Sequence, residues 1–151
     1  MTIAISDRIE RSVEIKAPID RVWRAITTES EFSQWFGLRI LGGNFQPGVS
    51  VRCVSTHPGY EHIEFTVEIE RLEPPTRFSW RWVPGAEQPK NEPTTLVEFT
   101  LEEVKEGTRV TITESGFDRL SLAYRAKAYE DNTGGWEYQA NSLRNYVAQS
   151  S

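Results

Sequence analysis

The chain has 151 residues, of which 17 are basic and 22 acidic, so its formal net charge at pH 7 is −5. A length close to the ~150 residues of one domain predicts a single domain over residues 1–151, and the acidic balance argues against nucleic acid as a partner. The lone Cys53 excludes an internal disulfide framework, no apolar run approaches the ~18 residues of a membrane span, and the start of the chain has no secretory leader pattern, so we expect a cytoplasmic protein.

The first quarter of the chain predicts one strand and two short helices. Residues 8–16 alternate apolar and polar side chains as a half-buried strand does, although Arg11 interrupts the apolar side. Pro18 fits the first position of a helix, where its missing N–H costs nothing. A second short helix is expected from Thr28, because Thr28 and Glu31 have the spacing of a capping box.

Six further strands and one long helix follow. The strands are expected near residues 38–41, 49–53, 62–72, 77–82, 97–101 and 110–114. The double glycine Gly42-Gly43 predicts a bulge or a close backbone approach, and residues 83–93, rich in proline, predict a mobile loop. From about Leu120 to Ala148 the spacing becomes helical, and Gly134-Gly135 in its middle predicts a kink or close packing.

This order predicts an α+β fold in which an antiparallel sheet packs against the C-terminal helix. The apolar face of the sheet must be covered, and the last helix alone is long enough to cover it. Because a wide sheet cannot close fully on one helix of ~10 Å diameter, a cavity is expected between them.

Six motifs, taken in their order and spacing, resemble the START-like (SRPBCC, helix-grip) superfamily. They are Ala17-Pro18-x-x-x-Val22-Trp23-x-Ala25-Ile26-Thr27, Trp35-Phe36, Gly42-Gly43-x-Phe45-x-Pro47-Gly48, Leu72-x-Pro74-Pro75-x-x-Phe78-x-Trp80, Glu114-Ser115-Gly116-Phe117 and Gly134-Gly135-Trp136. Within the superfamily the chain looks like the branch named for the C-terminal domain of the activator of heat-shock protein 90 ATPase, from about Arg8 to Val147. The resemblance implies a curved seven-stranded antiparallel sheet around a long C-terminal helix and a cavity for an apolar small molecule. It implies no single reaction, since the superfamily includes lipid carriers, plant-hormone binders and polyketide cyclases.

The side chains that we expect at the cavity wall are mostly aromatic. They are Trp35, Phe78, Trp80, Trp82, Phe99, Ile112, Tyr124 and Trp136, together with the charged residues Arg11 and Glu114. Aromatic faces suit an apolar or planar ligand, although each ring taken singly fits an ordinary core equally well.

Glu114 is the most informative polar residue, because it continues the apolar face of Val110 and Ile112. A buried carboxylate must be paired, protonated or hydrated. If the first and last strands are neighbours, Arg11 and Glu114 meet at the cavity wall as an ion pair; the alternative is that both reach solvent near the strand ends. Glu114 as a general acid or base is a weaker alternative.

The sequence supports neither a metal centre nor a reactive thiol. His57, Glu61 and His62 flank a Pro-Gly turn and lack the spacing of a closed metal site, so we expect both histidines to be exposed. Cys53 has no basic partner nearby in the sequence and is expected to pack as a small apolar residue. We expect no metal and no cofactor, and we assign no catalytic residue.

Three functions remain open. The leading hypothesis is a domain that binds a small hydrophobic molecule between sheet and helix. The second is a cyclase- or hydrolase-like enzyme acting on a hydrophobic aromatic substrate, which needs convergent polar groups in the cavity. The third is an interaction module that contacts a chaperone or a second copy of the chain, which predicts an exposed apolar patch.

Overall fold

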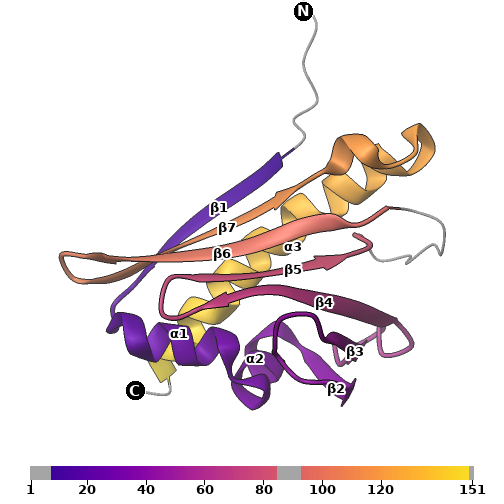
Figure 1. The fold of residues 1–151 in the computed structure, drawn as a ribbon. Helices are drawn as coiled ribbons and strands as arrows, with labels where there is room; N and C mark the ends of the chain where they lie inside the picture. The colour runs from indigo at the N-terminus through magenta and orange to yellow at the C-terminus, as the bar shows by residue number, and fades with distance from the viewer. Residues whose placement is uncertain (1–7, 85–92, 150–151) are drawn as a thin grey trace, which may run out of the picture.

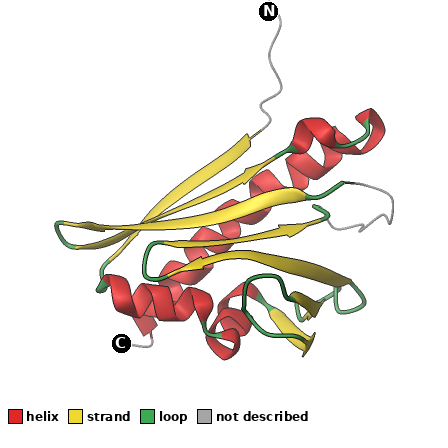
Figure 2. Cartoon of the chain, in the orientation of Figure 1, coloured by secondary structure: helices red, strands yellow, loops and turns green. Residues whose placement is uncertain are grey.

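The computed structural model describes residues 8–84 and 93–149, and it has the predicted α+β helix-grip fold (Figure 1). In chain order the elements are β1 (Arg8–Ile15), α1 (Ile19–Thr27), α2 (Glu29–Phe36), β2 (Leu38–Gly42), β3 (Ser50–Ser55), β4 (Glu64–Glu73), β5 (Arg77–Trp82), β6 (Thr95–Val104), β7 (Gly107–Ser115), a 3-10 turn (Phe117–Arg119) and α3 (Leu122–Gln149). Helix α3 runs along one face of the sheet, and α1 and α2 lie beside its C-terminal half (Figure 2). The predicted order of elements is confirmed.

All seven strands belong to one antiparallel sheet, in the order β1-β7-β6-β5-β4-β3-β2. The first and last strands of the chain are therefore neighbours, as expected. The edge strand β2 contains the predicted bulge, seen as a register shift between Ile40 and Gly42. The next glycine, Gly43, has a φ of +94°, and a Cβ there would lie 2.6 Å from the carbonyl oxygen of Ser50, so only glycine allows this approach.

The two short helices start differently from the sequence expectation. Pro18 is extended (φ −61°, ψ 151°) and forms the N-cap of α1, so the helix begins one residue later, at Ile19. The predicted capping box is wrong, because Thr28 makes no side-chain cap bond. Glu31 instead lies 2.9 Å from the guanidinium of Arg21 and accepts a 2.9 Å hydrogen bond from Tyr146. Partners on α1 and α3 thus replace the local bond.

Helix α3 continues through both of its central glycines. A Cβ at Gly134 or Gly135 would meet no atom within 4 Å, so close packing does not account for either residue. Across the described residues, no helix combines the length and the apolar character needed to cross a membrane. Most of the loop expected over residues 83–93 lies outside the described residues.

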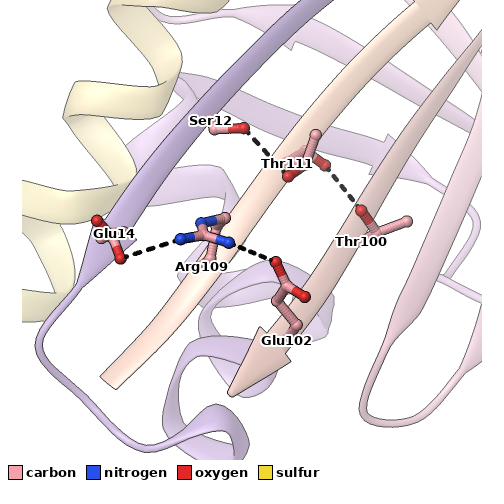
Figure 3. Close-up of polar contacts among 6 residues, drawn as sticks. All are labelled: Ser12, Glu14, Thr100, Glu102, Arg109 and Thr111. Atoms are coloured by element: carbon pink, nitrogen blue, oxygen red, sulfur yellow. Dashed lines mark hydrogen bonds and ion pairs between the residues drawn. The ribbon is translucent and has the colours of Figure 1, made fainter. Parts of the chain in front are cut away.

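The outer face of the sheet carries polar side chains in two ladders across β1, β7 and β6 (Figure 3). Arg109 lies between two carboxylates, 2.8 Å from Glu102 and 3.5 Å from Glu14. Ser12 shares a 3.1 Å hydrogen bond with the hydroxyl of Thr111. Because this face is solvated, the inner face toward α3 is where the core and the candidate site lie.

Candidate functional site

The space between the middle of the sheet and α3 is filled by aromatic rings. Trp80 on β5 and Trp136 on α3 meet there with ring centroids 6.2 Å apart, and Phe99 lies 5.4 Å from Trp80. The hollow that remains beside Trp80 measures about 10 Å³, close to the space of one water molecule. At this point of the fold the expected cavity is filled by a packed core.

Five of the predicted wall residues belong to this core alone: Trp35, Phe78, Trp80, Phe99 and Ile112, each at most 3% exposed. A sixth, Trp136, is also 3% exposed and packs against Trp80. The indole of Trp35 donates a 2.8 Å hydrogen bond to the carbonyl of Ala25, which joins α2 to α1. A ligand-binding role for these five residues stays a prediction.

An open groove of about 820 Å³ lies beside the core, where the turn between β3 and β4 faces α3. Its apolar wall includes Phe36, Phe65, Trp82 and Trp136, so two of the predicted wall residues line it. Polar side chains stand among these rings: Ser55, His57, Lys127, Asp131, Asn132 and Gln139. Tyr60 and Tyr138, which are 52% and 59% exposed, also line the groove. The volume falls within the range of small-molecule sites.

Glu114 on β7 is fully buried behind the groove. One carboxylate oxygen accepts from the indole N–H of Trp136 (2.7 Å) and from the amide of Asn132 (2.8 Å). The other accepts from the indole of Trp82 (2.8 Å) and the hydroxyl of Thr95 (2.5 Å). Four hydrogen-bonding groups therefore converge on the carboxylate, two on each oxygen.

The predicted ion pair between Arg11 and Glu114 is wrong. The register of β1 on β7 places Ile9 opposite Glu114 and Arg11 opposite Ile112. The guanidinium of Arg11 donates to the carbonyl of Glu10 (2.9 Å) and borders a separate surface hollow of about 560 Å³ on the far side of α3. The four neutral donors described above occupy the acceptor sites that the arginine was expected to use.

Tyr124, the remaining predicted wall residue, lies at the start of α3. It is half-buried, and its hydroxyl donates a hydrogen bond to the carbonyl of Pro84. It is not among the residues that line the groove. Its contact joins the first turn of α3 to the end of β5.

The carbonyl of Phe36, the last residue of α2, is shared by two groove side chains. It accepts a 2.9 Å hydrogen bond from Nε2 of Gln139 and lies 3.1 Å from Nε2 of His57. His57 is therefore half-buried, which corrects its expected exposure, whereas His62 is exposed as predicted. Gly37, which caps α2 with a φ of +85°, leaves room for this arrangement, because a Cβ there would lie 2.3 Å from the His57 ring.

Sequence reasoning missed the polar side chains that α3 contributes. Asn132 and Gln139 precede and follow Trp136 by four and three residues. Positions three and four apart share one face of a helix. Had Trp136 been used as the reference position, this spacing would have found both residues.

Chemistry by Cys53 is disfavoured by its surroundings. Burial raises the pKa of the Cys53 thiol to about 12, so the thiol keeps its proton at neutral pH. The Oε1 atom of Glu61, one of the residues considered for a metal, accepts a 2.7 Å hydrogen bond from the backbone of Gly59. Within residues 8–84 and 93–149, no group of three His, Cys, Asp or Glu side chains is placed to hold a metal ion.

Comparison with known proteins agrees with this architecture. A family model described as "Activator of Hsp90 ATPase homolog 1-like protein" matches residues 16–148. A search of curated proteins found no match.

Solved structures share the fold over nearly the whole chain. Protein Ms6760 from Mycobacterium smegmatis superposes with a TM-score of 0.76 at 18% identity, covering 96% of this chain and 93% of that one. The Aha1 dimer from Colwellia psychrerythraea gives 0.70 at 21% identity, covering 93% and 95%. DynU16, a protein in the dynemicin biosynthetic locus, gives 0.72 at 25% identity and covers 97% of this chain but 49% of its own, so this chain spans about half of DynU16.

Proposed function

Because the chain belongs to the activator of Hsp90 ATPase homolog 1-like family of the START-like superfamily, we propose that it binds a small hydrophobic molecule in the groove between the sheet and α3. The proposal treats residues 1–151 as one ligand-binding domain. The observation that carries it is the groove itself, which combines about 820 Å³ of open space with a wall rich in aromatic side chains.

The shape of α3 supports this assignment. Gly135 lines the groove, and a Cβ at this position would meet no other atom. Glycine in a helix interior costs about 1 kcal/mol relative to alanine. Packing does not require glycine at position 135. The absence of a side chain there keeps the groove open beside Trp136.

The polar side chains of the groove support binding over catalysis, because they are engaged with one another or with the backbone. The ammonium of Lys127 lies 3.5 Å from the carboxylate of Asp131. His57 and Gln139 both use the Phe36 carbonyl. A catalytic site would need a nucleophile or base that is oriented toward the open space.

Native mass spectrometry of freshly purified protein tests the proposal. We expect a species heavier than the chain that returns to the chain mass after denaturation, and a fluorescence change of the groove tryptophans when a neutral hydrophobic dye is added. A protein that carries no molecule and takes up no dye would overturn the proposal.

A matched pair of helix variants locates the binding site. Gly135→Leu fills the groove and should weaken dye binding at least tenfold. Gly134→Leu places the same side chain on an exposed position that does not line the groove, and should leave binding within twofold. Equal effects of the two substitutions would contradict the assigned site.

A second candidate, a protein-interaction surface, is favoured by the exposure of Tyr60 and Tyr138 along the groove. The partner would be a chaperone or a second copy of the chain, and a dimeric relative of known structure has the same fold. Light scattering after size exclusion, and retention on immobilised heat-shock protein 90, would test it. Loss of either association in Tyr60→Ser and Tyr138→Ser would support this candidate, whereas a monomer without retention would eliminate it.

A further inference from the structure

The groove has a net negative charge close behind its aromatic wall. Glu114 is fully buried, and its carboxylate is held by two indoles, one amide and one hydroxyl, all of them neutral. Among the described residues no lysine, arginine or histidine forms an ion pair with it. Its charge is therefore stabilised by dipoles and is not cancelled by an opposite charge.

Two tryptophans connect this carboxylate to the groove. The indoles of Trp82 and Trp136 each donate their N–H to Glu114 and each also line the groove, with ring centroids 5.8 Å apart and planes 33° apart. The face of an indole attracts cations through its ring quadrupole. An N–H donated to an anion is polarised, which strengthens the negative character of the ring face.

The orientation of Gln139 adds an unpaired hydrogen-bond acceptor to this site. The Phe36 carbonyl can only accept, so the Gln139 atom that contacts it must be the amide nitrogen. The side-chain oxygen of Gln139 is then the other atom, and it is buried without a partner in the described structure, in a residue that is 8% exposed. By the same reasoning Nε2 of His57 is the donor to the Phe36 carbonyl.

The remaining charges of the groove cancel each other. Lys127 and Asp131 lie one helical turn apart on α3 and form an ion pair. The buried carboxylate therefore sets the sign of the field that a bound molecule experiences.

We propose that the ligand of the groove is a flat, apolar molecule that carries a positive charge or a protonated nitrogen, of the class of aromatic amines, and that anionic amphiphiles such as fatty acids are excluded. This inference rests on the proposed function of the groove. Aromatic walls select the flat ring system, while the carboxylate behind them and the acceptors beside them select cationic donors.

Three tricyclic probes of equal size and different charge test the proposal: aminoacridine (a cation at neutral pH), anthracenemethanol (neutral) and anthracenecarboxylate (an anion). Binding to the purified full-length chain is measured by calorimetry at low salt. We expect aminoacridine to bind at least tenfold more tightly than anthracenecarboxylate, with anthracenemethanol between them. An anion that binds as tightly as the cation would overturn the inference about charge.

Two variants separate this inference from the proposed function. Gly135→Leu should weaken all three probes, because it fills the site; no binding of any probe to the wild type would reject the groove as a binding site. Glu114→Gln should reduce the ratio of cation affinity to neutral-probe affinity at least threefold, a ratio that a general loss of groove structure would not change. If that variant does not fold, the comparison of probes on the wild type decides alone.

Discussion

The inner face of the sheet has two neighbouring regions that are built from the same kind of side chain and packed to very different densities. Trp80 lies in a core whose remaining hollow is about 10 Å³, whereas Trp82, with its ring centroid 5.5 Å away, borders a groove of about 820 Å³. Trp80 contacts rings from α2, β6 and α3, while no element of residues 8–84 and 93–149 covers the space beyond Trp82. A high aromatic content therefore does not by itself predict an open site; which elements cover the rings decides it.

The largest expected difference between the two regions is in stability. Phe99→Ala empties part of the packed core and should lower the free energy of unfolding by about 3–5 kcal/mol. Leu122→Ala is the control, because Leu122 is 82% exposed and its loss should change stability by no more than about 0.5 kcal/mol. Urea unfolding measures both. A loss below about 1 kcal/mol for Phe99→Ala would mean that the core is not densely packed.

Glu114 lies at the boundary between the packed core and the groove, where it binds the indoles of Trp82 and Trp136. Glu114→Gln turns an amide N–H₂ toward groups that are themselves donors and should cost about 2–3 kcal/mol. Glu102→Gln breaks the exposed contact with Arg109 on the outer face and should cost no more than about 0.5 kcal/mol. If thermal or urea unfolding showed equal losses of stability for the two variants, the buried carboxylate of Glu114 would contribute no more than the exposed one of Glu102.

The titration of Cys53 tests whether the packed core around Trp80 shields its buried thiol from water. Its pKa is raised to about 12 in the folded protein from 9.0, so the folded state keeps the proton longer than the unfolded state does. The stability that this provides is complete below about pH 9 and is lost as the pH rises toward 12, by up to ~1.4 kcal/mol per pH unit. Unfolding of the wild type and of Cys53→Ala from about pH 8 to about pH 10 should therefore converge as the pH rises.

A thiol reagent provides an independent check on Cys53. Since the thiol is buried, the reagent should modify the folded protein only at the rate of global unfolding. Rapid modification under native conditions would show that the region around Trp80 opens.

The smallest expected effect concerns the two glycines of α3. Gly134→Ala and Gly135→Ala should each stabilise the protein by up to about 1 kcal/mol, because neither added methyl group meets another atom. Thermal unfolding should not distinguish them, but dye binding should, because only Gly135 lines the groove. If both variants were destabilised, the helix would require glycine at these positions for another reason.

The sequence was sufficient for the fold because its elements are specified locally. The alternation in β4 and the double glycine before β3 act on neighbouring residues, and both expectations are confirmed. The burial of Glu114 also followed from its place on the face of Ile112. Strand periodicity fixes which side a residue faces, and this is the information that the pattern contains.

The partners of these residues could not be predicted, because they depend on contacts across long stretches of chain. Glu31 forms no local cap with Thr28; its carboxylate instead accepts a hydrogen bond from Tyr146, which is 115 residues away. Glu114 is bound by side chains of β5, β6 and α3, none of which is marked by its spacing from Arg11. The groove lies between the β3–β4 turn and α3, and no local pattern encodes the distance between these two segments.

The shared carbonyl of Phe36 makes one atom common to three segments that are far apart in the chain. Helix α2 ends there, the β3–β4 turn reaches it through His57, and α3 reaches it through Gln139. A guest molecule that turned the Gln139 amide toward itself would take one of the two donors from this oxygen, and occupancy of the groove would then be coupled to the contacts at the end of α2. By reciprocity, a change at that terminus would alter the affinity of the groove for its guest.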